Sequence, residues 1–319
     1  MKKFIISIFL LTVTSGYSQE LNLPVFTQYL ADNPFVVSPT FAGIGDNLRI
    51  RANGLTQWVG IKDAPNNQSI YADFRIADQS GVGLSVYNDK NGYTRQAGAK
   101  VSFAHHIILD YYSKQYLSFG ISFNINNFKI DIEDSKPGTF DPSITDNRFN
   151  SNNNFDVGFL YRNKSFFMSF NASNILNKDI ENFSGIEPDL IRNYQIYSGY
   201  VIKGDNNKFD IEPSVYYQLF ASDKRSSTDF NVKYRHYDRY NDYYWAGMSY
   251  RFLNDQLLKP NSVGPMVGLK KSNFYFGYSY QLALNQIGAF NAGTHVITIG
   301  LDFLQGISNC PCTQGPVHD

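Results

Sequence analysis

The sequence predicts an all-β fold, a transmembrane antiparallel β-barrel of about 14 strands with an irregular N-terminal plug or lid segment. Short segments alternate between apolar and polar side chains along most of the chain, 16% of the residues are aromatic, and short and long connections tend to follow one another in turn. In the first two alternating segments the polar face carries Arg49, Arg51, Asp73 and Arg75. A soluble core rarely accommodates such a face, whereas a barrel with a lipid-facing outside and a wet interior does.

The first residues of the chain predict export. Lys2 and Lys3 precede an apolar run over residues 4–13, and small residues at positions 16 and 18 favour cleavage before Gln19. The run is too short for a membrane-spanning helix, which needs roughly 20 residues. We therefore predict a signal peptide over residues 1–18 and a location in the bacterial outer membrane.

The composition narrows the class of protein. The chain has 23 Tyr and 26 Phe, and its formal net charge is zero. A neutral chain offers no broad basic surface, so we expect no nucleic-acid partner. The mean hydropathy of −0.32 is that of many soluble proteins. Membrane strands average toward neutral because their two faces alternate, so the strand faces, and not this average, decide between a barrel and a soluble β-sandwich.

Behind the leader we expect an N-terminal segment over residues 19–46, a barrel over 47–303 and a tail over 304–319. Residues 26–43 are apolar and aromatic but have no period of 2 or 3.6, and Pro34 and Pro39 interrupt them. We predict that this stretch folds against the barrel interior or its periplasmic mouth. The plug or partner candidates are Phe26, Tyr29, Phe35, Phe41 and, after the first strand, Trp58.

The alternating segments predict the strands, and the connections predict their sidedness. The connections after even-numbered strands are short and most of the others are longer, which places the short turns and both termini of the mature protein in the periplasm. The predicted strands are 48–57, 69–76, 81–87, 95–107, 115–130, 153–161, 165–173, 193–202, 208–219, 228–236, 243–252, 262–269, 274–282 and 295–303.

Charged side chains of both signs are predicted to face the interior. Asp210 and Glu212 share one face of a strand, and Lys233 and Arg235 share a face of the next. Paired carboxylates can perform acid–base chemistry, but opposite charges on adjoining strands favour a ladder of ion pairs. The complete predicted set is Arg49, Arg51, Asp73, Arg75, Lys100, Asp156, Asp210, Glu212, Lys233 and Arg235.

We predict no enzymatic activity and no catalytic, cofactor-binding or metal site. The chain has 5 His and contains neither a GxSxG elbow nor an HExxH motif. His105, His236 and His295 fall on apolar faces near strand ends, where an interfacial imidazole is ordinary. The acidic loop over residues 131–146 favours a solvated surface, with calcium binding left open, and residues 87–93 favour a plain turn.

The tail contains the only two cysteines, Cys310 and Cys312, separated by one proline. This pair alone supplies too few ligands for zinc. A strained disulfide, pairing with a periplasmic partner and a reduced state are all open, since an exported protein meets oxidising conditions. The tail is also a candidate partner contact.

The run FTQYLADNPFVVSPTFAG, followed by RANGLTQWVGIKDAP and IYADF, resembles the opening of the PorP/SprF family, and EPSVYYQL at residues 212–219 extends the likeness. These are outer-membrane proteins of the type IX secretion and gliding machinery of Bacteroidetes. The resemblance implies a barrel that helps to export a large secreted protein or anchors it at the cell surface. The implied partners are an adhesin-like protein with a C-terminal sorting domain, other type IX components on the periplasmic side, and membrane lipids.

Two function classes follow. The first is a non-enzymatic barrel that binds a secreted protein, and the second is a FadL-like or porin-like uptake channel for small ligands. A transporter needs an apolar pocket leading to a lateral opening, whereas this sequence predicts a charged, crowded interior and a plug. The first class is therefore favoured.

Overall fold

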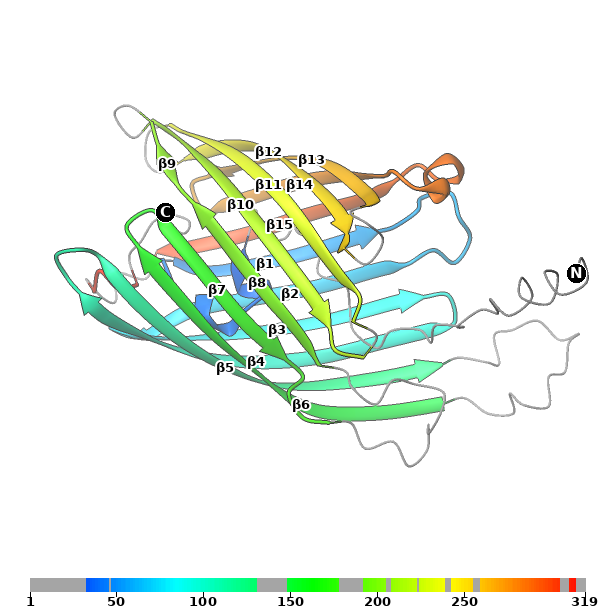
Figure 1. The fold of residues 1–319 in the computed structure, drawn as a ribbon, viewed down its shortest axis with the longest axis horizontal. Helices are drawn as coiled ribbons and strands as arrows, with labels where there is room; N and C mark the ends of the chain where they lie inside the picture. The colour runs from blue at the N-terminus through cyan, green and yellow to red at the C-terminus, as the bar shows by residue number, and fades with distance from the viewer. Residues whose placement is uncertain are drawn as a thin grey trace, which may run out of the picture.

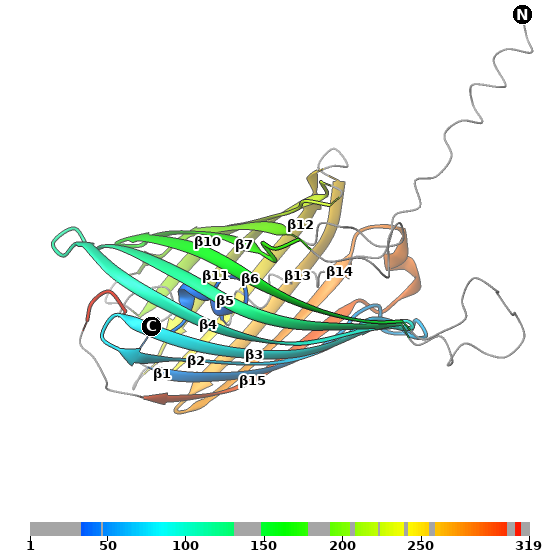
Figure 2. The ribbon, with the colours of Figure 1, turned by 90° about the horizontal axis from the view of Figure 1, so that it is seen from below.

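The computed structural model describes residues 33–45, 47–130, 148–177, 192–204, 208–222, 224–238, 242–254, 259–304 and 310–313. Among these residues no helix is long and apolar enough to cross a membrane. Antiparallel strands pair in one continuous sheet, and β10 also pairs with β11 at the far end of the strand order, so the sheet closes on itself (Figures 1 and 2). The predicted barrel is confirmed.

The wall contains 14 strands, because the two-residue β9 follows β8 directly and pairs with the same neighbour, β10. Each predicted segment corresponds to one of them. In chain order they are β1 (Asn47–Thr56), β2 (Asn66–Ala77), β3 (Ser80–Asn91), β4 (Thr94–Asp110), β5 (Gln115–Ile130), β6 (Arg148–Asn163), β7 (Phe166–Ser173), β8 (Asn193–Tyr200) with β9 (Ile202–Lys203), β10 (Phe209–Phe220), β11 (Ser226–Tyr237), β12 (Tyr243–Leu253), β13 (Lys259–Lys271), β14 (Phe274–Ala283) and β15 (Thr294–Leu304).

Strands β3 and β6 differ most from the prediction, whereas β5 has the predicted bounds. The segment predicted as a turn over residues 87–93 is mostly strand, and only Gly92 and Tyr93 connect β3 to β4. Strand β6 begins at Arg148, where it pairs with Ile130, several residues before its predicted start. The added residues are rich in Asn and Ser, so they carry no apolar alternation by which the sequence reveals a strand.

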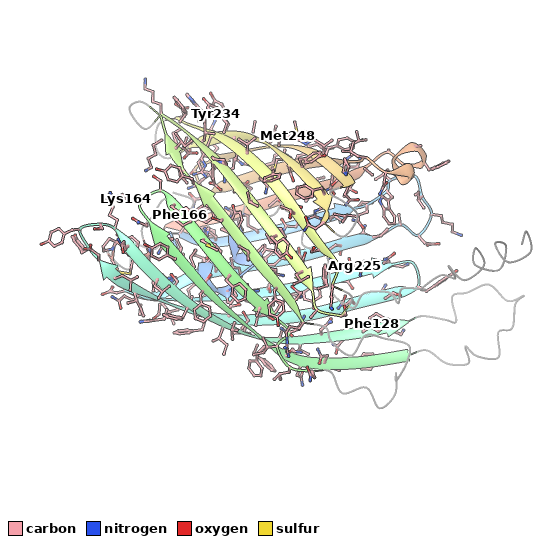
Figure 3. All side chains as sticks on the ribbon, viewed as in Figure 1. Phe128, Lys164, Phe166, Arg225, Tyr234 and Met248 are labelled. Atoms are coloured by element: carbon pink, nitrogen blue, oxygen red, sulfur yellow. A yellow bond between two sulfur atoms is a disulfide. The ribbon has the colours of Figure 1, made fainter. Side chains whose placement is uncertain are left out.

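The two faces of the wall are inverted relative to a soluble protein. Along β14, Phe274 and Phe276 are exposed on the outside, whereas Tyr275 and Ser279 are buried inside. Tyr234 and Met248 likewise project outward from β11 and β12 (Figure 3). This apolar outside and polar inside is the arrangement that a lipid environment requires.

A short segment of the N-terminal region lies inside the barrel (Figure 2). It consists of two single-turn 3-10 helices, η1 (Pro34–Val36) and η2 (Pro39–Phe41). Each begins with a proline behind a capping residue: the Phe35 amide donates to Asn33 Oδ1 at 3.1 Å, and the Thr40 amide donates to Ser38 Oγ at 3.3 Å. The prolines that excluded a regular helix therefore start these turns. A further 3-10 helix, η6 (Gln286–Phe290), lies in the β14–β15 connection.

Candidate functional site: the plug and the barrel interior

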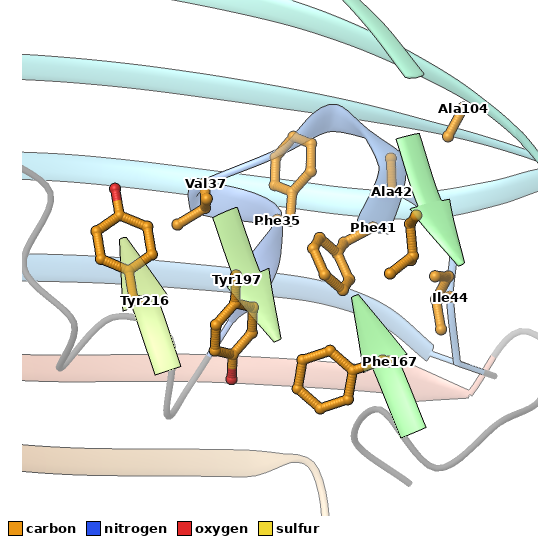
Figure 4. Packing of buried hydrophobic residues seen from close by; sticks show 10 residues of the cluster. Phe35, Val37, Phe41, Ala42, Ile44, Ala104, Phe167, Tyr197 and Tyr216 are labelled. Atoms are coloured by element: carbon orange, nitrogen blue, oxygen red, sulfur yellow. The ribbon is translucent and has the colours of Figure 1, made fainter. Parts of the chain in front are cut away.

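Residues 33–45 form a plug with an apolar core. Phe35 and Phe41 are only 4% and 1% exposed. The Phe41 ring lies 6.3 Å from that of Tyr197 on β8, which in turn lies 5.0 Å from Phe167 on β7 (Figure 4). Each buried phenylalanine contributes about 1.5–3 kcal/mol, which offsets part of the ordering entropy of the segment. The cluster comprises Phe35, Val37, Phe41, Ala42, Ile44, Ala104, Leu160, Phe167, Tyr197 and Tyr216.

Glycines on the inner face of the wall make room for this plug. A Cβ added to Gly120 on β5 would lie 2.5 Å from the Thr40 nitrogen, and one added to Gly83 on β3 would lie 2.2 Å from the Phe35 ring. The corresponding distance from Gly158 on β6 to Ser38 Oγ would be 2.6 Å. An added side chain would collide with plug backbone at Gly120, and at Gly83 and Gly158 it would displace the Phe35 ring or the Ser38 hydroxyl.

Polar contacts fix the end of the plug. Asp73 on β2 accepts from the Gly43 amide at 3.1 Å and from Arg49 Nη2 at 2.7 Å. The buried His106 on β4 lies between the Ala42 carbonyl oxygen, 3.0 Å from Nε2, and the Ser118 hydroxyl, 2.8 Å from Nδ1. Because a carbonyl only accepts, Nε2 carries the hydrogen of this contact, and Nδ1 shares a hydrogen bond with the Ser118 hydroxyl.

The interior charges form pairs between strands. Lys233 Nζ lies 3.2 Å from Glu212 Oε2, and Arg235 lies 3.6 Å from Asp210 and 3.7 Å from Glu212. These residues are all buried, and the register places Asp210 opposite Arg235 and Glu212 opposite Lys233. The arrangement is a ladder of ion pairs rather than a pair of carboxylates facing a substrate.

Other pairs join strands that are far apart in the sequence. Arg51 Nη1 on β1 lies 2.5 Å from Asp302 Oδ1 on β15, and its guanidinium lies 4.2 Å from the centre of the Tyr275 ring. Lys100 Nζ on β4 reaches across β5 to Asp156 Oδ2 on β6 at 2.5 Å. Of the ten charged residues predicted for the interior, the remaining one, Arg75, contacts the plug and the tail: its Nη2 donates to the Gly45 carbonyl at 2.6 Å.

Several interior residues were not singled out by sequence. Asp229 on β11 forms a two-pronged pair with Arg251 on β12, with both nitrogen–oxygen distances at 2.7 Å. His106 and Arg162 also face inward, and both are buried. The alternation that reveals the strands contains the signal for all of them, because each shares the face of recognised polar residues.

The other predicted candidates are scattered. Trp58 is half-buried in the β1–β2 connection, where the Val59 amide donates to the Gly293 carbonyl at 3.0 Å, and it is not a member of the plug cluster. Cys310 and Cys312 form a disulfide with a Cα–Cα distance of 5.3 Å. Phe26, Tyr29 and the acidic loop over residues 131–146 lie outside the described residues.

The histidines predicted at the interface have aromatic and hydroxyl neighbours. His236 stacks on Tyr244 with ring centroids 4.9 Å apart, and His295 Nδ1 lies 2.8 Å from the Tyr278 hydroxyl. His105 Nδ1 lies 3.0 Å from the Ser80 hydroxyl. Within the described part of the chain, no group of three or more His, Cys, Asp or Glu side chains is arranged to hold a metal ion.

Solved structures share the architecture. The CymD monoaromatic hydrocarbon channel is 10% identical with a TM-score of 0.51, covering 89% of this chain and 94% of that one. A FadL homologue of Pseudomonas aeruginosa is 10% identical (TM-score 0.45, covering 81% of this chain and 89% of that one). Omp33 of Acinetobacter baumannii is 11% identical (TM-score 0.45, covering 82% and 100%). At these identities the likeness concerns the fold alone.

The sequence comparison is more specific. No curated protein sequence matches the chain. The family described as type IX secretion system membrane protein PorP/SprF matches residues 18–301, which include the plug and almost the whole wall. The chain therefore belongs to the PorP/SprF family of type IX secretion system membrane proteins and is an outer-membrane β-barrel.

Proposed function

We propose that this barrel is non-enzymatic and binds a protein secreted by the type IX system, helping its export or anchoring it at the cell surface. The observation that carries the proposal is membership of a type IX secretion family in a barrel whose lumen holds a plug. The partner is a large adhesin-like protein with a C-terminal sorting domain. Other type IX components contact the periplasmic side, and lipids surround the wall.

The proposed orientation follows from the connections. Most of the short turns, the Gly45 end of the plug and residues 310–313 share one end of the barrel, which we assign to the periplasm; the two-residue β3–β4 turn is a short connection at the other end. The signal peptide over residues 1–18 is removed before insertion. The longer connections then lie at the cell surface, where loops on a rigid scaffold present a recognition surface.

The plug completes the partner-binding form in this proposal. Its apolar core, contributed by Phe35 and Phe41, is tied to the wall by Asp73 and His106. A seated plug holds β2 to β8 and β10 in one arrangement, because its cluster and tethers contact side chains from most of these strands. The connections that follow these strands are thereby positioned for the partner.

An uptake channel for small ligands is the alternative. The wall at β10 and β11 presents the paired charges of Asp210, Glu212, Lys233 and Arg235 to the interior. An apolar ligand would have to displace or pass these desolvated pairs, which opposes its binding. The interior chemistry therefore favours a protein-binding scaffold.

Affinity isolation tests the proposal. The tagged protein is purified from detergent-solubilised outer membrane, and the proteins bound to it are identified by mass spectrometry. The expected result is a secreted protein with a C-terminal sorting domain. Deletion of residues 21–40 removes most of the plug and should abolish this association, while heat-dependent migration on a gel verifies that the deleted barrel still inserts.

Conductance separates the two functions. The purified parent is expected to be silent in a planar bilayer, and the deletion variant to conduct. Isolation of no secreted protein, together with plug-dependent uptake of small apolar ligands by intact cells, would support the channel and contradict the proposal. A deletion variant that stays closed and keeps its secreted partner would show that the plug neither closes the lumen nor contributes to partner binding.

A further inference from the structure

The described part of the tail folds back onto the end of the barrel that carries the short turns. Figure 2 shows residues 310–313 in red at this end, beside the turn between β2 and β3. Cys312 and Thr313 are both 0% exposed. Residues near a chain terminus are usually mobile unless specific contacts hold them. Four sets of contacts hold this segment.

The first set joins the tail to the plug. The Thr313 carbonyl oxygen accepts from the Gly45 amide at 2.7 Å, directly where the plug leaves the lumen. It also accepts from Arg75 Nη2 at 3.4 Å. The same Arg75 nitrogen donates to the Gly45 carbonyl at 2.6 Å, so one guanidinium on β2 contacts both the tail and the plug.

The second and third sets join the tail to the wall. Arg162 Nη2 on β6 donates to the Cys312 carbonyl. The Thr313 hydroxyl lies 3.4 Å from the Asp78 carbonyl in the β2–β3 turn. The Cys312 sulfur also contacts this carbonyl at 3.9 Å, but as part of a disulfide it carries no hydrogen to donate. The tail therefore links β2, β6 and the plug at one place.

The fourth set lies within the tail. The Thr313 amide and hydroxyl donate to the Cys310 carbonyl at 3.2 and 3.1 Å, and the Cys312 amide lies 3.4 Å from Cys310 Sγ. The disulfide closes this turn covalently. A covalent closure restricts the conformations open to the released tail and so favours the docked turn.

We propose that the Cys310–Cys312 disulfide is a redox-sensitive clasp on the plug. In the oxidised state it presents the Cys312 and Thr313 carbonyls to Arg162, Arg75 and the Gly45 amide. In the reduced state the turn opens, these acceptors leave, and the end of the plug loosens. The inference goes beyond the proposed function, because it concerns access to the lumen whatever the secreted partner is.

The reductant is a dithiol, such as the Cys-X-X-Cys pair of a thioredoxin-like protein. Its first thiolate attacks Cys310 Sγ, because Cys310 is half-buried and Cys312 is fully buried. A mixed disulfide with Cys310 forms, and Cys312 leaves as a thiolate. The second thiolate of the reductant then attacks the reductant sulfur that is bonded to Cys310, and Cys310 leaves as a thiolate. The clasp gains two electrons and two protons, and the dithiol becomes a disulfide.

Hydrogen exchange measured by mass spectrometry tests the clasp in full-length protein in lipid nanodiscs. Dithiothreitol is the reductant, and alkylation of an unfolded aliquot verifies that both thiols are free. Reduction is expected to accelerate exchange of the Gly43 and Gly45 amides at least tenfold, while β5 amides stay unchanged. The double variant Cys310→Ser/Cys312→Ser should exchange rapidly with or without dithiothreitol. Unchanged protection of Gly45 in verified reduced protein would overturn the proposal.

Arginine variants test the contacts with the disulfide intact. Arg75→Gln should accelerate exchange at Gly45, because the guanidinium that contacts plug and tail is lost. Arg95→Gln changes an exposed arginine at the beginning of β4, far from the tail, and serves as the matched control. Equal exchange at Gly45 in the two variants would contradict the clasp. If Arg75→Gln fails to insert, the dithiothreitol experiment on the unaltered protein still decides.

Discussion

Two sides of the barrel wall fill the lumen in different ways. On the plug side, β3, β5 and β6 place Gly83, Gly120 and Gly158 against plug atoms. On the ion-paired side, β10 to β12 place Asp210, Glu212 and Asp229 against basic residues of the neighbouring strand. The plug side receives a separate segment beside its own pairs, such as Lys100–Asp156, and the other side fills its interior with its own side chains. A polar inner face of a membrane barrel can therefore either receive a separate segment or form ion pairs between strands. Glycine on that face indicates the first arrangement, and charged residues indicate the second.

The energetics of the two sides also differ. A buried ion pair adds little net stability, since desolvation offsets its attraction, but removal of one partner leaves an uncompensated charge. A glycine that faces the plug makes no ion pair that a substitution could break. A side chain added there clashes with the plug, so its free-energy cost acts on the seating of the plug. Substitutions on the ion-paired side should destabilise the whole barrel, whereas those on the plug side should displace the plug alone.

The largest effect is expected from Asp229→Ala on the ion-paired side. Arg251 loses both of its 2.7 Å contacts and remains buried with its charge. We expect the free energy of unfolding to fall by about 3–5 kcal/mol. Urea titration in lipid vesicles, followed by heat-dependent gel migration, measures the change.

A matched double variant supplies the control for this prediction. Asp229→Leu/Arg251→Met removes both charges and keeps similar volume, so its loss should be clearly smaller than that of Asp229→Ala. Equal losses in the two variants would mean that packing, and not the uncompensated charge, determines stability there.

A smaller effect is expected on the outer face, where β5 of the plug side and β14 should behave alike. Phe119 on β5 and Phe276 on β14 are 39% and 43% exposed and face outward. Arginine at either position should cost about 2–4 kcal/mol if it lies near the bilayer midplane. The same urea titration reports both losses. A large difference between Phe119→Arg and Phe276→Arg would show that the outer face also differs between the plug side and the rest of the wall.

The strands and part of the ion-pair ladder could be predicted from the sequence, because both depend on residues that lie close together along the chain. Alternation marks each strand, and a short connection brings Asp210 opposite Arg235. The pairing of Arg51 with Asp302 could not be predicted, since the two residues are 251 positions apart and meet only through closure of the barrel. Lys100 and Asp156 are likewise separated by an entire intervening strand.

The plug and the tail show a second limit. The aperiodic stretch before β1 predicts a segment folded against the barrel, but it does not say which inner residues receive it. Gly120 and Gly158 leave room for the plug, which their place in the sequence does not reveal. Gly300 instead leaves room for a side chain of the neighbouring strand, since an added Cβ would lie 2.6 Å from Arg51 Cδ. The docking of Thr313 on Gly45 joins the two ends of the chain, and no local pattern encodes it.

The smallest effect on the barrel, and the most informative about the plug, is expected from Gly120→Ala. The added Cβ would lie 2.5 Å from the Thr40 nitrogen and 2.8 Å from the Pro39 carbonyl carbon, which are both backbone atoms and cannot rotate away. Overpacking of this kind costs about 1–3 kcal/mol. Because each 1.4 kcal/mol is a factor of ten, the population with a displaced plug should rise by roughly one to two orders of magnitude. Faster hydrogen exchange at Thr40 and Phe41 measures that rise, while the urea midpoint of the barrel should hardly move.

Gly54→Ala on β1 is the matched control, since nothing lies within 4 Å of its added Cβ, and it should change neither quantity. If Gly120→Ala exchanges like Gly54→Ala, the plug is not held against β5 and the contrast between the two sides fails. If it lowers the urea midpoint as much as Asp229→Ala does, plug and wall unfold as one unit, and glycines and ion pairs serve the same structural purpose.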